Sequence, residues 1–287
     1  MLKVIIRQMA EEEERVLQEE FRWLLLHEVN TVLRQLQTVL QECSKWFLLP
    51  GSTEACLVKA EKYLLTSATG ADNVKAVITL YGDNICTADM SVKIHRHSTQ
   101  NFRTSFREGL QWKLQAIQNA ANHLQAALDH VTSIDQGYLF QTGEEVVKVM
   151  DDIMGRLNRG RDCLTTPRKR TLEELYSSKI MKMFSPALPN EVIVSFHIHC
   201  HKLVLGAYQV HPLQSSSQKP KTALPAIYHP TGSVFELSSQ KYEVVQANKV
   251  EVAVPWLNDV ITYFTVGLQL CQQLKDKITV FQQYWKD

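Results

Sequence analysis

The chain has 287 residues, 45% of them hydrophobic, and its 31 basic side chains nearly balance its 30 acidic ones, which leaves a formal net charge of +1. This length and apolar content predict one large folded domain or two ordinary ones, and they exclude intrinsic disorder. The balanced charge excludes a whole-molecule field that attracts nucleic acid or an anionic membrane.

A long helix is predicted over residues 10–44, because apolar side chains recur there at alternating intervals of three and four. The acidic run at residues 11–14 is expected in its first turn, where negative charge is favourable. Residues 49–51 are expected to end it. The apolar stripe of this helix comprises Leu17, Phe21, Leu25, Val29, Val32, Leu36, Val39 and Cys43.

The period then changes to two, which is typical of strands. Short strands are predicted at residues 63–66, 74–81 and 90–95, separated by turns at residues 70–73 and 82–84. These three strands read as a β-meander.

Two further helices follow. A helical stripe begins at Leu110 and comprises Leu110, Leu114, Ile117, Ala121, Leu124, Leu128 and Val131. Thr142 and Glu145 have the spacing of a capping box for the next helix. The side chains of that helix expected to point inward are Val146, Met150, Ile153 and Leu157. A linker of about ten residues makes the two helices antiparallel neighbours.

A basic stretch at residues 156–170 leads into a short helix that Thr171 and Glu174 are expected to cap. The sequence SPALP ends this helix. Strands are predicted at residues 191–200, 202–210, 233–237 and 241–254, with a long, mobile loop at residues 212–230.

The most regular helical pattern lies at residues 255–285, which open on a proline, as first helical turns often do. Its stripe comprises Leu257, Val260, Phe264, Gly267, Cys271, Leu274, Ile278, Phe281 and Trp285. A helix of this length, about 45 Å, must lie along something equally long.

The alternation of helical and β-rich segments predicts an α+β fold. We expect an elongated two-domain protein with an antiparallel four-helix bundle and an antiparallel β domain, both discontinuous in sequence. The bundle is assigned to residues 1–50, 108–165 and 255–287, and the β domain to residues 51–107 and 166–254. The β domain is expected at one end of the bundle and the termini at the other.

Histidines are the first candidates for chemistry. His197, His199 and His201 alternate in one predicted strand, and His95 and His97 alternate in another, so that each set shares a face that could hold zinc. The same alternation places apolar residues on the opposite face. We therefore favour solvent-facing histidines over a zinc-binding module, and we expect no metal and no cofactor.

Catalytic motifs are missing. The sequence contains no GxSxG, HExxH, GxxxxGK[ST] or strand-following GxGxxG pattern. Asp151 and Asp152 are adjacent rather than on one helical face, and they read as polar surface. The chain is expected not to be an enzyme.

Two features suggest binding. The basic stretch could hold phosphate groups or an acidic partner, although a solvated helix end is the favoured interpretation. The apolar helical stripes could form a coiled coil between two chains and so a homodimer. Four stripes of matching length in one chain can instead cover one another, which favours an internal bundle and a monomer. A partner helix could dock on a second apolar stripe formed by Trp23, Leu24 and Leu26.

Six scattered cysteines without a CxxC pair fit a reducing compartment. The apolar patch at residues 1–10 is too short for a signal peptide and runs into an acidic run, and no apolar stretch is long enough to cross a membrane. A cytoplasmic location is expected.

Six stretches of the sequence are long enough to be specific: EEFRWLL at residues 19–25, QWKLQAIQ at 111–118, LTTP at 164–167, FSPALP at 184–189, VPWLNDV at 254–260 and LQLCQQLKDKI at 268–278. Through these stretches the chain closely resembles the Rogdi family of leucine-zipper proteins, and the similarity runs nearly end to end.

The resemblance implies a non-enzymatic adaptor subunit of the rabconnectin complex, the animal counterpart of the yeast regulator that reassembles the V-ATPase. It implies WD-repeat partner subunits and peripheral association with endosomal and synaptic vesicle membranes through those partners. The nuclear envelope is a further location, and the balanced charge predicts no nucleic-acid partner. The resemblance also implies a helical domain with a β domain. It assigns no catalytic, metal or cofactor role to any residue.

Overall fold

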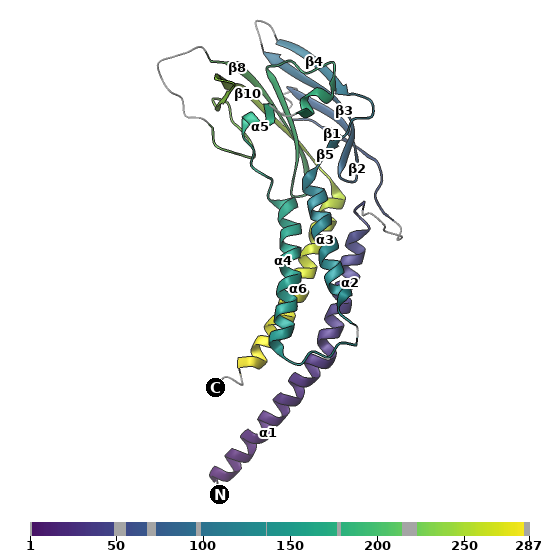
Figure 1. The fold of residues 1–287 in the computed structure, drawn as a ribbon, viewed down its shortest axis with the longest axis vertical. Helices are drawn as coiled ribbons and strands as arrows, with labels where there is room; N and C mark the ends of the chain where they lie inside the picture. Colours follow the sequence, from purple (N-terminus) through teal and green to yellow (C-terminus); the bar gives the residue numbers. More distant parts are fainter. Residues whose placement is uncertain are drawn as a thin grey trace. The chain divides into compact units, whose positions relative to one another are not determined.

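The computed structural model describes residues 2–48, 56–67, 73–95, 99–135, 137–176, 179–213 and 223–283. The predicted helix stop at residues 49–51, most of the turn at 70–73, His97, residues 214–222 of the long loop and Trp285 lie outside them. Helices and two antiparallel sheets make up the described chain, so the α+β class is confirmed (Figure 1).

The chain divides into two compact units, each assembled from segments that are far apart in sequence. The helical unit comprises Met1–Lys45, Ala120–Asp162 and Asp259–Asp287. The sheet unit comprises Trp46–Asn119 and Cys163–Asn258.

The first helix begins earlier than predicted. α1 spans Leu2–Trp23, a π-helical turn spans Leu24–Glu28, and α2 spans Val29–Ser44. The acidic residues 11–14 therefore lie in the middle of α1, and their predicted place in a first turn is wrong. Arg15 pairs with Glu12 at 2.5 Å and with Glu19 at 2.7 Å, three and four residues away. Such pairs support an exposed helix.

The stripe of the last helix is buried as predicted. α6 spans Pro255–Gln283. Within the described residues its stripe members are buried, except that Phe281 is only partly covered. In α2 the expected stripe is partly wrong, because Leu33 and Leu40 are buried whereas Val32 and Val39 are only partly so. The larger leucines therefore form the core-facing line of α2.

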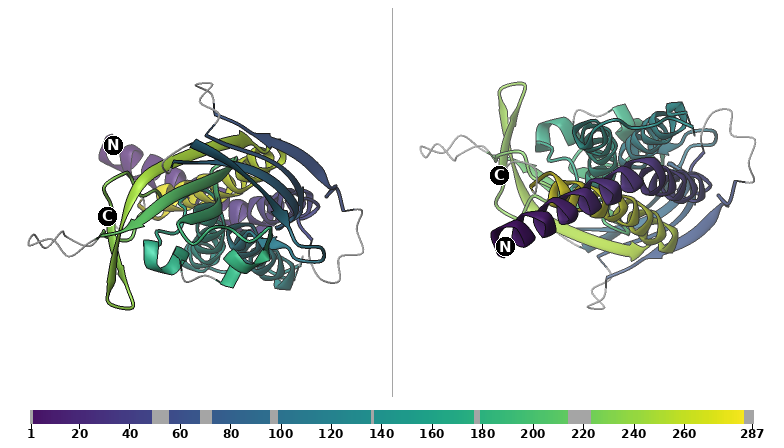
Figure 2. Two further views of the ribbon diagram at one scale, coloured as in Figure 1. Left: turned by 90° about the horizontal axis from the view of Figure 1, so that it is seen from above. Right: turned by 90° about the horizontal axis from the view of Figure 1, so that it is seen from below.

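Glycines let the helices of this unit approach closely. α3 spans Gln115–Ser133 and α4 spans Gly143–Thr165. A Cβ on Gly160 of α4 would lie 2.6 Å from the ring of Phe264, and one on Gly267 of α6 would lie 3.0 Å from Leu157. Seen along their length, α2, α3, α4 and α6 are grouped side by side (Figure 2). The apolar stripes therefore cover one another within one chain.

The ends of α3 and α4 follow local rules. The N–H of Glu145 donates to Thr142 Oγ1 at 3.2 Å, which confirms the predicted cap. The Glu145 carboxylate accepts from the N–H of Gln141 at 3.1 Å, one residue before the expected partner. α3 does not include Leu110, which is exposed, because Trp112–Lys113 form the short strand β5 instead.

The first sheet has six strands, and the sequence predicted three of them. Its order is β1-β2-β3-β4-β6, with β5 paired to β3, and all pairs are antiparallel. The β1-β2-β3 meander was predicted, although β3 is longer than expected. The strands are β1 (Glu61–Leu65), β2 (Val74–Tyr81), β3 (Asn84–His95), β4 (Thr99–Phe106), β5 and β6 (Phe184–Ser185).

The second sheet has four strands in the order β7-β8-β10-β9. The four predicted strands are all present, with shifts of one or two residues at their ends. They are β7 (Val192–His199), β8 (Lys202–Pro212), β9 (Val234–Leu237) and β10 (Gln240–Ala253). The predicted short helix is α5 (Leu172–Tyr176), and Thr171 caps it through the N–H of Glu174 at 3.1 Å. A 3₁₀ turn at Lys179–Met183 follows it.

Aromatic and polar contacts join the two sheets. The ring of Phe196 on β7 lies 5.2 Å from that of Trp112 on β5 and 6.2 Å from that of Phe106 on β4. The buried carboxamide of Gln209 on β8 donates to the carbonyl of His95 at 2.8 Å and accepts from its N–H at 3.0 Å. Because both carboxamide groups are satisfied, this buried polar side chain fixes one sheet against the other.

Two glycines of α4 provide a matched test of the helix contacts. Nothing lies within 4 Å of a Cβ on Gly155, so Gly155→Ala should raise the free energy of unfolding by about 0.5 to 1 kcal/mol. Gly160→Ala must displace the buried Phe264 ring, and it should lower that free energy by about 1 to 3 kcal/mol. Urea unfolding followed by far-ultraviolet circular dichroism measures both. Equal effects of the two substitutions would contradict the close approach of α4 and α6.

Candidate functional site

The candidate histidines that the structure describes do not form a metal site. His197 and His199 lie on β7, whereas His201 lies in the turn that joins β7 to β8. His95 ends β3, where its ring lies 3.2 Å from the Thr99 hydroxyl. In the part of the chain that the structure describes, no three His, Cys, Asp or Glu side chains come together as metal ligands.

The prediction that the β7 histidines face solvent is wrong for His197. Ile193 and Ser195, which share its side of the strand, are buried. Leu172 and Leu175 of α5 pack with Ile193 on this side, so both faces of β7 are covered. A strand covered on both faces does not alternate between apolar and polar residues, and alternation therefore misled the prediction.

Burial changes the titration of His197. Loss of water lowers the pKa of its imidazole from 6.5 to about 4, and the nearby positive charges of Lys249 and Arg170 act in the same direction, as does His199. Its Nε2 atom is buried, with no hydrogen-bond partner among the described residues. His197 is therefore neutral at pH 7.

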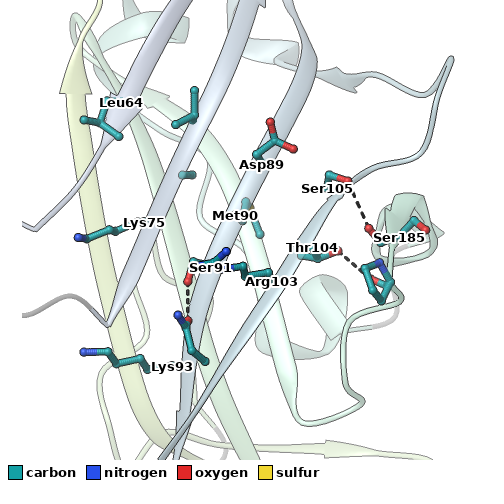
Figure 3. A pocket seen from close by; sticks show the side chains of 14 residues that line it. Leu64, Lys75, Asp89, Met90, Ser91, Lys93, Arg103, Thr104, Ser105 and Ser185 are labelled. Atoms are coloured by element: carbon teal, nitrogen blue, oxygen red, sulfur yellow. Dashed lines mark hydrogen bonds between the residues drawn. The ribbon is translucent and has the colours of Figure 1, made fainter.

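An open pocket of about 630 Å³ crosses the outer face of the first sheet. Figure 3 shows the exposed Leu64 on β1 and three charged lining residues, Lys75 on β2 and Asp89 and Lys93 on β3. One margin is fixed where Thr104 Oγ1 donates to the carbonyl of Pro186 at 2.7 Å. Mixed charges beside an exposed leucine are typical of a contact surface for another macromolecule.

The helical unit has a more apolar pocket, of about 520 Å³, which we call the Trp23 pocket. Trp23 is 58% exposed in it, whereas its neighbour Leu24 is 3% exposed. The pocket is lined by Glu19, Glu20, Trp23, Leu24, Glu28, Lys277 and Phe281. An exposed indole beside an apolar floor has the chemistry of an interaction site.

Local structure explains how the Trp23 pocket forms. The π-helical turn follows Trp23 directly, and such turns are frequent at functional sites. The predicted docking stripe of Trp23, Leu24 and Leu26 is divided, because Leu24 is buried and Leu26 lines a separate pocket with Leu139 and Phe140. Only Trp23 remains as the exposed anchor.

Carboxylates surround the Trp23 pocket on the α1 side. Glu19 pairs with Arg15, and Glu28 pairs with Lys277 of α6, while Glu20 has no cationic partner in the described parts of the chain. The ring of Phe281 lies 5.5 Å from that of Phe21 and closes the other side. Phe281 and Lys277 were not predicted at this pocket, because no local sequence pattern relates them to residues about 250 positions earlier.

The basic stretch was expected to be solvated, and this holds for half of its basic side chains. Arg159, Arg168 and Lys169 are exposed, whereas Arg156, Arg161 and Arg170 are partly buried. Arg168 is exposed, and its guanidinium lies 3.8 Å from the Glu174 carboxylate. Arg170 is half-buried and lines a smaller pocket of the sheet unit. Asp151 and Asp152 are exposed on α4, and Asp151 pairs with Lys275 of α6. No helix in the described segments is both long and apolar enough to cross a bilayer.

A family model described as Rogdi leucine zipper containing protein matches residues 20–241. The chain belongs to the Rogdi family. It is 50% identical over 274 residues to the human protein rogdi homolog, covering 95% of each chain. It is 39% identical to Drosophila melanogaster protein rogdi, covering 95% of this chain and 91% of that one.

A more distant Rogdi relative, the Caenorhabditis elegans protein rogdi homolog, is 30% identical over 272 residues, covering 88% of this chain and 84% of the relative. The matched region of the family model contains Trp23, the π-helical turn, the basic stretch and β7, but not the α6 residues of the Trp23 pocket. The Rogdi resemblance deduced from the sequence is confirmed.

The lowered pKa of His197 predicts how stability changes with pH in this Rogdi-family chain. The unfolded state binds a proton near pH 6.5 and the folded state only near pH 4, so stability should fall as the pH drops through this range. Between pH 7 and 5 the contribution of His197 amounts to about 2 kcal/mol.

Urea unfolding of the wild type and of His197→Gln at pH 7, 6 and 5 measures this contribution. The variant should lose less stability across the range. Burial also lowers the pKa values of His123 and His229, so that a residual slope remains. Measurements at pH 5 and above stay outside most of the range in which Glu251 changes stability. Hydrogen bonds from Lys202 and Lys249 lower its pKa from 4.5 to about 2 in the folded state, so its contribution is lost mainly below the unfolded value of 4.5. An unchanged slope in His197→Gln would contradict the burial of this imidazole.

Proposed function

We propose that this Rogdi-family chain is a non-enzymatic adaptor subunit of a rabconnectin complex that regulates V-ATPase assembly and the acidification of vesicles and endosomes. The proposal rests on the family and on what the resemblance implies for it. In this proposal the chain is cytoplasmic and its partners are WD-repeat subunits. Through these subunits it associates with the membrane that holds the proton pump. The chain needs no cofactor for this role.

The exposed apolar surface of the helical unit supports the adaptor part of the proposal. Ile5, Ile6 and Met9 of α1 are each about half exposed or more, and Trp23 is exposed farther along the same helix. Large exposed apolar surfaces on a folded protein mark interaction sites, because leaving them in water is unfavourable. An adaptor requires a surface of this kind.

The Trp23 pocket is the contact that the proposal assigns to a partner. Trp and aromatic neighbours in a pocket dominate many protein interfaces, and Trp23 with Phe281 fits that description. The lining has three carboxylates, those of Glu19, Glu20 and Glu28, against the single cation Lys277, and this excess of negative charge favours a basic segment over an acidic one. The occupant is therefore an apolar segment with flanking Lys or Arg from a WD-repeat subunit.

Co-purification from cell extract tests the role and the surface together. The wild-type chain should recover both WD-repeat subunits and subunits of the V-ATPase. Trp23→Ala should lose most of this recovery while remaining folded, because the indole is largely exposed. Val280→Ala, a substitution of a side chain that is 51% exposed on α6 and does not line the pocket, should recover the partners normally.

The outcomes separate the alternatives. Recovery of neither a WD-repeat subunit nor a pump subunit by the wild type would contradict the adaptor role. Normal recovery by Trp23→Ala would retain the role but reject this pocket. Light scattering of the free chain addresses the homodimeric zipper, which the exposed residues of α1 also favour. A monomer mass at micromolar concentration would exclude it.

A further inference from the structure

The sheet unit contains a pocket whose charged lining is basic, whereas the lining of the Trp23 pocket is mainly acidic. This basic pocket encloses about 270 Å³, and we call it the Arg170 pocket. Three segments line it: the β5 strand with the start of α3, the chain after α4, and the middle of β7. Its charged lining residues are Lys113, Arg168 and Arg170, and no lining residue is a carboxylic acid.

The three cations are not equally neutralised. Lys113 lies 2.9 Å from a carboxylate oxygen of Asp83, and Arg168 lies 3.8 Å from Glu174. Arg170 has no carboxylate partner anywhere in the described segments of the chain, although it is half-buried. A partly desolvated guanidinium without a counterion favours the binding of an anion.

The backbone of Arg170 is held in place. Its N–H donates to the carbonyl of Ala226 at 3.0 Å, and its carbonyl accepts from the N–H of Ala226 at 3.0 Å. His229 Nε2 lies 2.9 Å from the same carbonyl. The main chain at Arg170 is therefore fixed, so the base of its side chain has a defined position beside the pocket.

Neutral groups in the same pocket add hydrogen-bonding capacity. His197 lines it, and its buried Nε2 has no partner among the residues that the structure describes. α3, a helix of 19 residues, begins there at Gln115. The first N–H groups of a helix lack partners within it and carry the positive end of its dipole, which adds to the field of Arg170.

We propose that the Arg170 pocket binds the phosphate group of a small phosphorylated ligand, with Arg170 as the main contact. A guanidinium presents paired N–H donors that match phosphate oxygens. The volume lies below the range of about 300 to 1,000 Å³ that drug-sized ligands occupy, so the site suits a phosphate monoester rather than a nucleotide. The site is separate from the Trp23 pocket and does not depend on the adaptor role.

Thermal unfolding of the full chain in increasing inorganic phosphate, or in glycerol phosphate, tests the proposal. A ligand that binds only the folded state raises the midpoint in a saturable manner. The control is sodium chloride at matched ionic strength, which should give a smaller rise without saturation. Arg170→Gln should weaken the phosphate effect at least about tenfold, because a charged hydrogen-bond partner is lost.

Lys169→Gln is the matched variant. It removes the same charge one position away, from an exposed side chain that does not line the pocket, and it should leave the phosphate effect unchanged. If Arg170→Gln fails to fold, Arg170→Lys retains the charge but not the paired donors, and it should weaken binding in the folded protein. Equal effects of phosphate and chloride, or equal losses in Lys169→Gln and Arg170→Gln, would overturn the proposal.

Vesicle sedimentation distinguishes the two sources of such a phosphate. Vesicles of phosphatidylcholine with phosphatidic acid test a lipid headgroup, and phosphatidylcholine alone is the reference. Sedimentation that requires Arg170 would identify a lipid phosphate as the ligand. Saturable phosphate binding without sedimentation would identify a free ligand. If neither occurs, the pocket does not bind phosphate.

Discussion

The packing of α6 against α2 and α4 is the constraint on which the helical unit depends. Phe264 fits over Gly160, and Leu157 fits against Gly267, so that each large side chain meets a residue without a Cβ. Helix interiors rarely retain glycine, which costs about 1 kcal/mol relative to alanine in an exposed position. Close packing of Phe264, which is fully buried, offsets this cost. The same contacts bring together segments from both ends of the sequence.

This packing also determines which side chains remain available for partners. α2 is covered along its leucine stripe, whereas most side chains of α1 described by the structure are exposed. Ion pairs such as Arg7 with Glu11 support α1 locally, but exposed pairs of this type contribute less than about 1 kcal/mol each. The ion pairs of α1 therefore do not offset the unfavourable exposure of its apolar side chains to water. A partner that covers these side chains would remove that cost.

Periodicity in the sequence predicted where most of the helices and long strands lie. α6, α2, α4 and the strands β7, β8 and β10 fall where the pattern placed them. It did not predict which side chains of β7 face water, because α5 covers the second face of that strand. β4 has polar residues at most positions and was missed because its pairing with β3, rather than its own alternation, makes it a strand.

The candidate sites show the same limit. Trp23 was recognised as part of an apolar stripe, but the pocket also needs Phe281 and Lys277, which only the folded chain brings close. The basic stretch was recognised as a phosphate candidate, but it was judged to be a solvated surface. Arg170 departs from its neighbours because β7 and the Ala226 segment cover it. Burial of a single charge is a tertiary property that no local pattern contains.

The indole and the carboxylates of the Trp23 pocket differ in how much free energy they can contribute to binding a partner. A tryptophan side chain presents up to about 250 Å² of surface, and covering the exposed part of Trp23 at about 25 cal/mol per Å² would contribute about 2 to 4 kcal/mol to binding. A screened, exposed carboxylate such as Glu20 contributes less than about 1 kcal/mol. The indole therefore determines how tightly a partner is held, whereas the carboxylates determine which partner approaches and in which orientation, an effect that added salt weakens first.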